Sequence, residues 1–139
     1  MSDAILAGMP GYPAVGAPEI DDEHAAFESM LRRLCATAEQ KDAQAAANVL
    51  GALLVRAAGH FASEERLMLQ IRYVHMARHT AAHRQFLAQA RTIHNDLCNG
   101  GLEPAVSAWI AGAPRWFNAH VEVEDLALGE ALIAARAGR

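Results

Sequence analysis

HFASEERLMLQIRYVHMARHTAAH, the stretch from His60 to His83, decides the fold of this chain. His60 and Glu64 are four residues apart in it, and so are His79 and His83, on two segments whose apolar residues repeat with helical spacing. Residues i and i+4 of an α-helix project from one face, one turn apart. If the two segments face each other across a bundle, three imidazoles and one carboxylate meet in its core. Buried polar groups are costly unless something compensates them, so the pattern indicates a metal site.

The composition favours one soluble, helical domain. The chain has 139 residues, of which 53% are hydrophobic, and alanine is abundant while β-branched alternation is rare. The formal net charge is −4 without a run of basic residues, which argues against nucleic acid or an anionic membrane as a partner. No stretch has the roughly 18 to 20 uninterrupted apolar residues of a membrane span, and no basic segment precedes an apolar one at the N-terminus. We therefore expect a cytoplasmic protein, with Cys35 and Cys98 as free thiols.

The helical segments predict an all-α fold, an up-down-up-down antiparallel four-helix bundle with an extended N-terminal arm. Residues 1–18 are rich in proline and glycine and form the arm, which Tyr12 anchors. Residues 19–139 form the bundle. Its helices are expected from near Pro18 to the connection at 40–42, from about 43 to 71, from the loop at 72–74 to about 99, and from 102–104 to about 135. A kink or short break is expected at Gly112–Pro114 in the last helix.

Spacing alone leaves several ligand assignments open. His24 lies on the apolar stripe of the first helix, where a histidine is more often a hydrogen-bonded core residue than a ligand. His75 shares the row of His79 and His83, although those two continue directly into the apolar stripe. His120 has two carboxylate partners to choose from, because Glu124 has the regular i+4 spacing whereas Asp125 at i+5 needs a local distortion of the helix.

Two further residues near these candidates are expected to stay outside the site. Glu65 points away from Glu64 around the helix, so we expect it to be solvated. His94 lies near the far end of its helix and is expected to be exposed or to cap it.

All of these histidine positions except His94 fall toward one end of the bundle. In an up-down-up-down topology the start of the first and third helices lies level with the end of the second and fourth. His24 and His79 are early in their helices, whereas His60 and His120 are late in theirs. Five imidazoles and at least two carboxylates at one level exceed the needs of one tetrahedral zinc ion, so two metals bridged by carboxylates are expected.

The chain resembles the hemerythrin family, specifically the single-domain bacterial hemerythrins. The likeness rests on IDDEH around His24, HFASEERLM around His60, HTAAHRQF around His79 and WFNAHVEVED around His120. It implies a centre of two non-haem iron ions bridged by an oxo or hydroxo group and by the carboxylates of Glu64 and Asp125. It implies the following histidine ligands: His79, His83 and His120 on one iron, and His24 and His60 on the other.

The resemblance also implies the function. A member of this family binds dioxygen reversibly at the two-histidine iron, as a carrier, store, delivery protein or sensor, and is not an enzyme. The chain lacks the Glu-x-x-His pairs of oxygen-activating di-iron bundles, in agreement with this. Apolar residues within a turn of the ligands are expected to wall an oxygen pocket, namely Phe27, Phe61, Trp116, Phe117 and Val121. The alternative is a di-iron enzyme with peroxidase or nitric oxide-handling activity. Dioxygen is the expected partner, with an oxygen-using enzyme or a signalling protein as a second, and we expect a monomer.

Overall fold

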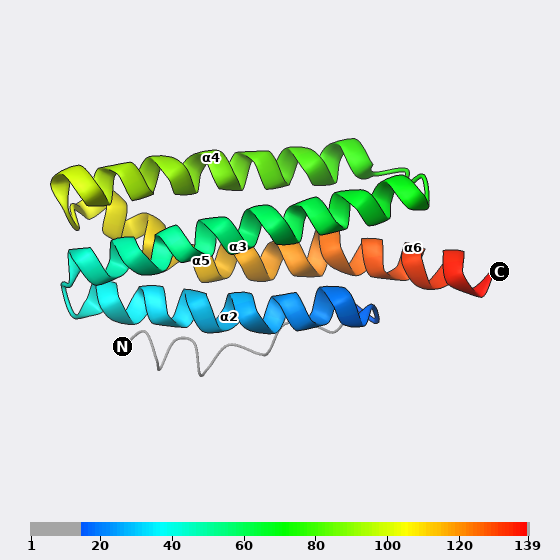
Figure 1. Ribbon diagram of the computed structural model, residues 1–139, viewed down its shortest axis with the longest axis horizontal. Helices are drawn as coiled ribbons and strands as arrows, with labels where there is room; N and C mark the ends of the chain where they lie inside the picture. The colour runs from blue at the N-terminus through cyan, green and yellow to red at the C-terminus, as the bar shows by residue number, and fades with distance from the viewer. Residues whose placement is uncertain (1–14, 139) are drawn as a thin grey trace.

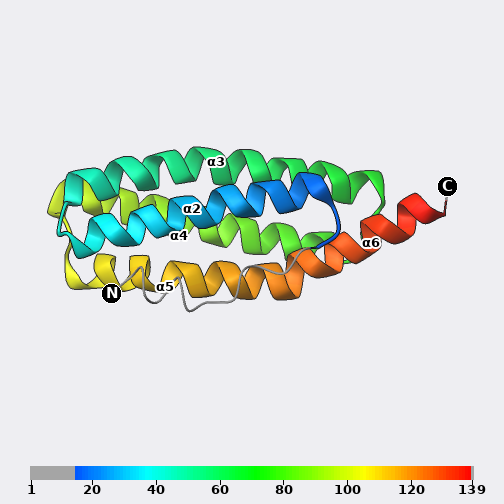
Figure 2. The same cartoon turned by 90° about the horizontal axis from the view of Figure 1, so that it is seen from below.

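Four helical rods lie side by side in the computed structural model, which describes residues 15–138, and each rod runs antiparallel to the next along the chain (Figure 1). The first three are α2 (Pro18–Glu39), α3 (Ala43–Gln70) and α4 (Met76–Gly100). The fourth consists of α5 (Pro104–His120), the π-helix η1 (Val121–Asp125) and α6 (Leu126–Ala137). The predicted all-α four-helix bundle is confirmed, with helix ends close to those that the sequence predicts. In both views α6 extends beyond the ends of its neighbours (Figure 2).

The helix ends follow local sequence chemistry. Pro18 begins α2 and Pro104 begins α5, where the missing N–H of proline costs no helical hydrogen bond. Asp42 caps α3, because its side chain accepts a hydrogen bond from the backbone N–H of Ala45 at 3.0 Å. Gly101 follows α4 with φ of 79°, a left-handed conformation that glycine adopts without steric cost. These signals are local, which is why the helices could be predicted from the sequence.

The core has an apolar half and a polar half with a layer of aromatic rings between them. Phe27 of α2 stacks on Phe117 of α5 with ring centroids 4.7 Å apart, and Phe61 of α3 packs edge-on against Phe86 of α4 at 6.0 Å. The apolar half includes Leu31, Leu34, Leu50, Leu53 and Ile110, all at most 1% exposed. α3 is long and apolar enough to cross a membrane, but a helix that lines the core of a bundle passes the same test.

The fourth rod is not broken at Gly112–Pro114, so of the expected kink or short break the break is absent. α5 continues through Pro114, which is buried. Proline has no N–H to donate to the carbonyl of residue 110 one turn earlier. The thiol of Cys35 on α2 lies 3.7 Å from the carbonyl oxygen of Ile110 and donates to it. A contact from another helix therefore compensates for the hydrogen bond that Pro114 cannot make.

The expected N-terminal arm lies mostly outside the described residues, since residues 1–14, with Tyr12, are not among them. Its last residues are held against the bundle. The backbone N–H of Val15 donates to Asp21 Oδ1 at 2.8 Å, and that of Gly16 to Asp21 Oδ2 at 3.3 Å. Val15 packs directly over Gly129 of α6, where a Cβ atom would overlap the backbone of Val15.

Candidate metal centre

The structure brings all seven predicted ligands together in the polar half of the core. They come from every rod of the bundle, and each is at most 5% exposed: His24 from α2, His60 and Glu64 from α3, His79 and His83 from α4, His120 from α5 and Asp125 from η1. Their ligand atoms form two groups within which every atom lies within 4.8 Å of the others. One group contains His79, His83 and His120, the other contains His24 and His60, and Glu64 and Asp125 belong to both.

The two carboxylates each face both groups. Glu64 directs Oε1 toward Nε2 of His79 and His83, at 3.1 and 3.0 Å, and directs Oε2 toward Nε2 of His60, at 2.8 Å. Asp125 repeats the arrangement. Its Oδ1 lies 3.0 Å from His79 Nε2, and its Oδ2 lies 2.8 Å from His24 Nε2. A carboxylate that offers one oxygen to each of two neighbouring ligand groups is arranged to bridge two cations.

Many of these polar atoms are close to one another without hydrogen-bond geometry. Buried atoms with no hydrogen-bond partner among the described residues include Nε2 of His60, His83 and His120, Oε2 of Glu64 and Oδ1 of Asp125. Buried polar groups in folded proteins are normally satisfied, so such a concentration of unsatisfied atoms calls for an explanation. Nitrogen and oxygen lone pairs that converge on shared points are what a cation requires. The residues present therefore fit a centre of two metal ions.

A π-helix explains how Asp125 joins the site. Five residues separate it from His120, and in a regular α-helix this spacing would turn it away from the histidine. The segment Val121–Asp125 is wound instead as a π-helix, which has i→i+5 hydrogen bonds, and Asp125 Oδ1 lies 3.1 Å from His120 Nε2. Glu124, the alternative with regular spacing, forms an ion pair with Arg78 at 3.2 Å. The local distortion that the sequence required for Asp125 is thus present.

The other histidines lie outside both ligand groups. His75 is exposed at the residue before α4 and packs its ring against Tyr73. His94 lies further along α4, where its ring faces Gly51 of α3. Neither is among the residues whose ligand atoms converge.

Aromatic rings pack directly on the ligand imidazoles. Phe61 stacks on His83 with ring centroids 3.9 Å apart, and the edge of His24 meets Phe117 at 5.5 Å. Phe27 and Val121 are fully buried beside them. The predicted wall residues Phe27, Phe61 and Phe117 thus pack against the ligand rings, and Val121, next to His120 in the chain, is buried.

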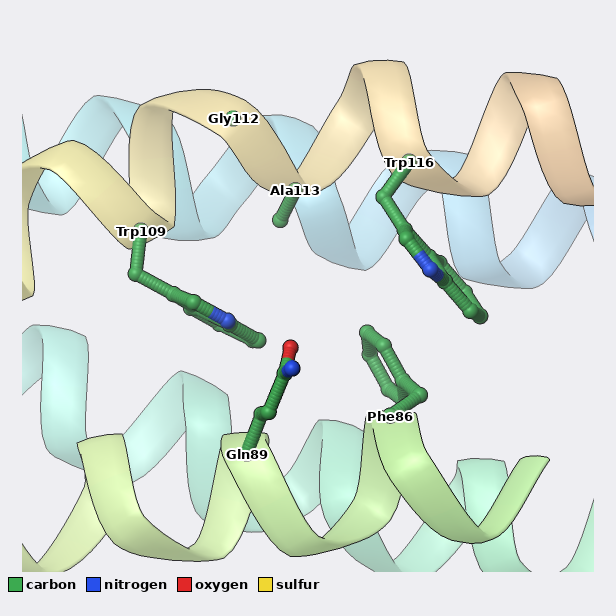
Figure 3. A pocket seen from close by; sticks show the side chains of 6 residues that line it. All are labelled: Phe86, Gln89, Trp109, Gly112, Ala113 and Trp116. Carbon is green, nitrogen blue, oxygen red and sulfur yellow. The ribbon is translucent and has the colours of Figure 1, made fainter. Parts of the chain in front are cut away.

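Trp116, the fifth predicted wall residue, stacks on His120 with ring centroids 5.0 Å apart and also lines a hollow of about 210 Å³ between α4 and α5 (Figure 3). Its lining consists of Phe86, Gln89, Trp109, Gly112, Ala113 and Trp116.

Three residues near the site were not predicted to be part of it, although Phe86 was expected to face the core. Glu65 was expected to be solvated, but its side chain is only 33% exposed and its Oε2 lies 3.1 Å from Nδ1 of His83. Phe86 stacks on Trp116 at 4.4 Å, and Tyr73 packs near His79 with a buried hydroxyl. The sequence did hold a signal for Glu65: it lies four residues after Phe61, so the two share one face of the helix.

Mutual contacts control the protonation of the cluster. Burial and the neighbouring Asp125 charge raise the pKa of Glu64, but contacts with His60, His79 and His83 outweigh them, so its pKa lies well below the ordinary value. Burial likewise raises the pKa of Asp125, and its histidine partners reverse the effect. Burial lowers the pKa of His79, yet Asp125 and Glu64 together raise it to about 9. Without a cation, the two carboxylates are therefore balanced by protons on imidazole.

Comparison with known proteins agrees with the geometry. A sequence model of the hemerythrin HHE cation binding domain matches residues 15–132. A crystal structure of a leucine-to-phenylalanine mutant is similar, with a TM-score of 0.75, 24% identity, and coverage of 85% of this chain and 89% of the other. A crystal structure of a leucine-to-tyrosine mutant of hemerythrin has a TM-score of 0.76, 23% identity and the same coverage of 85% and 89%.

A search of curated proteins finds no match. At these identities the two structures establish the fold, whereas the domain match spans most of the chain and includes all seven clustered ligands. The chain belongs to the hemerythrin family.

Proposed function

We propose that this protein binds dioxygen reversibly at a centre of two non-haem iron ions. The observation that carries the proposal is the position of Glu64 and Asp125, each with one oxygen toward the three-histidine group and the other toward the two-histidine group. The three-histidine group offers more ligands than the two-histidine group, so an ion held by His24 and His60 would keep room for an external ligand. Five imidazoles and only two carboxylates suit iron that cycles between its lower oxidation states.

The chain's own residues prepare this site in three ways. His79, His83 and His120 would hold one iron, His24 and His60 would hold the other, and Glu64 and Asp125 would each offer one oxygen to both. The rings of Phe27, Phe61 and Phe117 pack against the imidazoles and exclude water from the ligand side of the core. The π-helix keeps Asp125 aimed inward. Two iron ions bound at these positions would supply the reversible redox chemistry that dioxygen binding needs.

The wider setting is also part of the proposal. The net charge of −4 supports a small-molecule partner rather than nucleic acid or an anionic membrane. We propose a cytoplasmic monomer that stores, delivers or senses dioxygen, with an oxygen-using enzyme or a signalling protein as a further partner.

The test begins with protein loaded with Fe²⁺ under anaerobic conditions. Iron analysis is expected to give two ions per chain. An optical spectrum is recorded after exposure to air and again after deoxygenation without added reductant, and the starting spectrum should return. Sustained consumption of oxygen or peroxide with a reductant, together with irreversible oxidation in the first cycle, would support the di-iron enzyme instead. One metal per chain, or a preference for zinc, would contradict the two-iron centre.

A further inference from the structure

Glu64 and Glu65 contact the two nitrogens of the same imidazole, that of His83. His83 Nε2, the nitrogen that faces the metal group, lies 3.0 Å from Glu64 Oε1. His83 Nδ1, on the opposite side of the ring, lies 3.1 Å from Glu65 Oε2. The two carboxylates differ in setting, because the Glu64 side chain is 1% exposed and the Glu65 side chain 33%. Successive residues of α3 therefore contact His83 from inside and outside the cluster.

Phe61 restricts the same ring in a different direction. It lies one helical turn before Glu65 on α3, and its ring is almost parallel to that of His83, at 6° and 3.9 Å between centroids. Stacking fixes the plane of the imidazole. It does not decide between two orientations related by a half-turn about the Cβ–Cγ bond, which exchange Nδ1 and Nε2 with ring carbons. A polar partner at Nδ1 adds to the Glu64 contact at Nε2 in favouring one of them.

Glu65 supplies this partner at Nδ1 and also sets the tautomer. A carboxylate oxygen accepts a hydrogen bond, so Nδ1 of His83 carries the proton and donates it. The neutral ring then has its lone pair on Nε2, the atom aimed at the ligand group. His24 and His79 differ in this respect, since their Nδ1 atoms are buried with no hydrogen-bond partner among the described residues. His83 thus has a carboxylate partner at Nδ1, whereas Nδ1 of His24 and Nδ1 of His79 have none among the described residues.

We propose that Glu65 is a positioning residue that orients His83 and strengthens metal binding at the three-histidine position. This inference rests on the proposed two-metal centre. Partners at the second nitrogen of a metal-bound histidine typically change metal affinity about 10–100-fold when they are removed. The effect of Glu65 is confined to one of the two metals, because the contact reaches His83 and neither His24 nor His60.

The experiment compares Glu65→Ala, Glu65→Gln and Glu28→Ala in the full chain stripped of metal. Glu28 is a matched control: its side chain is 34% exposed, it pairs with Arg32 on α2, and its replacement changes the net charge equally. Alanine favours the helix at both positions, so the variants should fold. Co²⁺ serves as the probe metal, with competition by a chelator and detection by visible absorption.

Wild-type protein should bind two Co²⁺ ions. In Glu65→Ala the affinity for one ion should fall about 10–100-fold while the other stays within about threefold. Glu65→Gln should recover most of the loss, because its amide oxygen also accepts from Nδ1–H. In Co²⁺-loaded protein, proton NMR should show a hyperfine-shifted Nδ1–H resonance of His83 that exchanges much faster with solvent in Glu65→Ala.

Unchanged affinity at both positions in Glu65→Ala, or an equal loss in Glu28→Ala, would overturn the assignment. If Glu65→Ala does not fold, the Nδ1–H resonance of His83 is measured in Glu65→Gln instead. A chemical shift identical to that of the wild type would show that Glu65 does not accept this proton. Failure of the wild-type protein to bind two Co²⁺ ions would instead overturn the proposed centre itself, and this inference with it.

Discussion

The indole of Trp116 lies parallel to the imidazole of His120, with ring centroids 5.0 Å apart and planes 9° apart. Phe86 stacks on the same indole at 4.4 Å. Trp116 therefore stands between a metal-ligand candidate and the hollow between α4 and α5 (Figure 3). We therefore expect Trp116 to limit access of water to the ligands from this side.

Trp116→Ala should hasten autoxidation without removing the metal. The substitution joins the hollow to the ligand cluster, and water that enters would promote irreversible oxidation of the iron. We expect iron content near that of the wild type and several-fold faster passage of air-exposed protein to the diferric state, followed by optical absorption. Trp109→Ala is the control, because Trp109 lines the same hollow and contacts Phe86. Equal rates in the two variants would contradict a specific barrier at Trp116.

Asp125→Ala should lower metal content, whereas Glu124→Ala should leave it unchanged. Asp125 contacts histidines of both ligand groups, and Glu124 is engaged with Arg78. Metal analysis of the purified variants by mass spectrometry measures the difference. Iron loss in Glu124→Ala would show that the segment is a regular α-helix in solution.

Substitutions of the histidines should likewise lower the metal content only at ligand positions. His79→Ala should lose metal, since His79 contacts both bridging carboxylates. His75→Ala and His94→Ala should retain the wild-type content, because both residues lie outside the ligand groups. Metal analysis alongside His79→Ala provides the comparison, and loss in either of the other two variants would contradict the assignment.

The metal-free protein should lose stability as the pH rises from neutral to alkaline values. The pKa of His79 rises from the ordinary histidine value of 6.5 to about 9 in the fold, so its stabilising contribution is complete below about pH 6.5 and is lost as the pH rises through 9. The pKa values of Glu64 and Asp125 are lowered, so their contribution is present above their unfolded values of 4.5 and 3.8 and is lost toward acid. The free energy of unfolding should therefore be greatest between about pH 4.5 and 6.5.

Urea denaturation of the metal-free protein at several pH values measures this profile. The metal-loaded protein is the control, because bound cations replace the protons and should move the optimum toward higher pH. A metal-free protein that gains stability between about pH 6.5 and 9 would rule out the proposed balance of charges.

Gly129→Ala should destabilise the fold by about 1–3 kcal/mol. A Cβ atom at this position would overlap the backbone of Val15, which has little freedom to move while Asp21 holds it. Gly59→Ala on α3 is the matched control, since a Cβ there meets nothing within 4 Å. It should stabilise the protein by about 0.5–1 kcal/mol, as expected for alanine in a helix. Thermal unfolding of both variants tests the docking of the arm, because docking predicts that Gly129→Ala lowers the melting temperature and Gly59→Ala raises it.

Cys35→Ala should cost about 1–3 kcal/mol, because it leaves a small cavity and deprives the Ile110 carbonyl of its donor. Burial raises the pKa of Cys35 to about 11, so the thiol keeps its proton at neutral pH. Cys98→Ala, at an exposed position, should stay within about 0.5 kcal/mol of the wild type.

A double-mutant cycle identifies the cause. In a Pro114→Ala background the helix supplies its own donor to Ile110, and Cys35→Ala should cost less. If Cys35→Ala lowers the free energy of unfolding equally in the two backgrounds, the thiol acts through packing alone.

The sequence by itself determined the number of helices, their ends and the level at which the ligands meet. Apolar spacing, capping residues and proline positions act within a few residues, so they can be recognised without knowing what lies across the core. The same reasoning placed His60 with Glu64 and His79 with His83, because one helical turn separates the members of each pair. Five histidines at one level then followed from the up-down topology alone.

Tertiary structure decided how each side chain is turned and which neighbour it meets. Spacing left Asp125 and Glu124 open, and it is the π-helix, a change in hydrogen-bond pattern, that aims Asp125 inward. Pro114 sits in an unbroken helix, and the thiol of Cys35, distant in sequence, reaches the freed carbonyl. Glu65 was expected in solvent, but its carboxylate contacts Nδ1 of His83 on the facing helix. Each of these outcomes depends on the rotation and packing of one helix against another, which local periodicity does not specify.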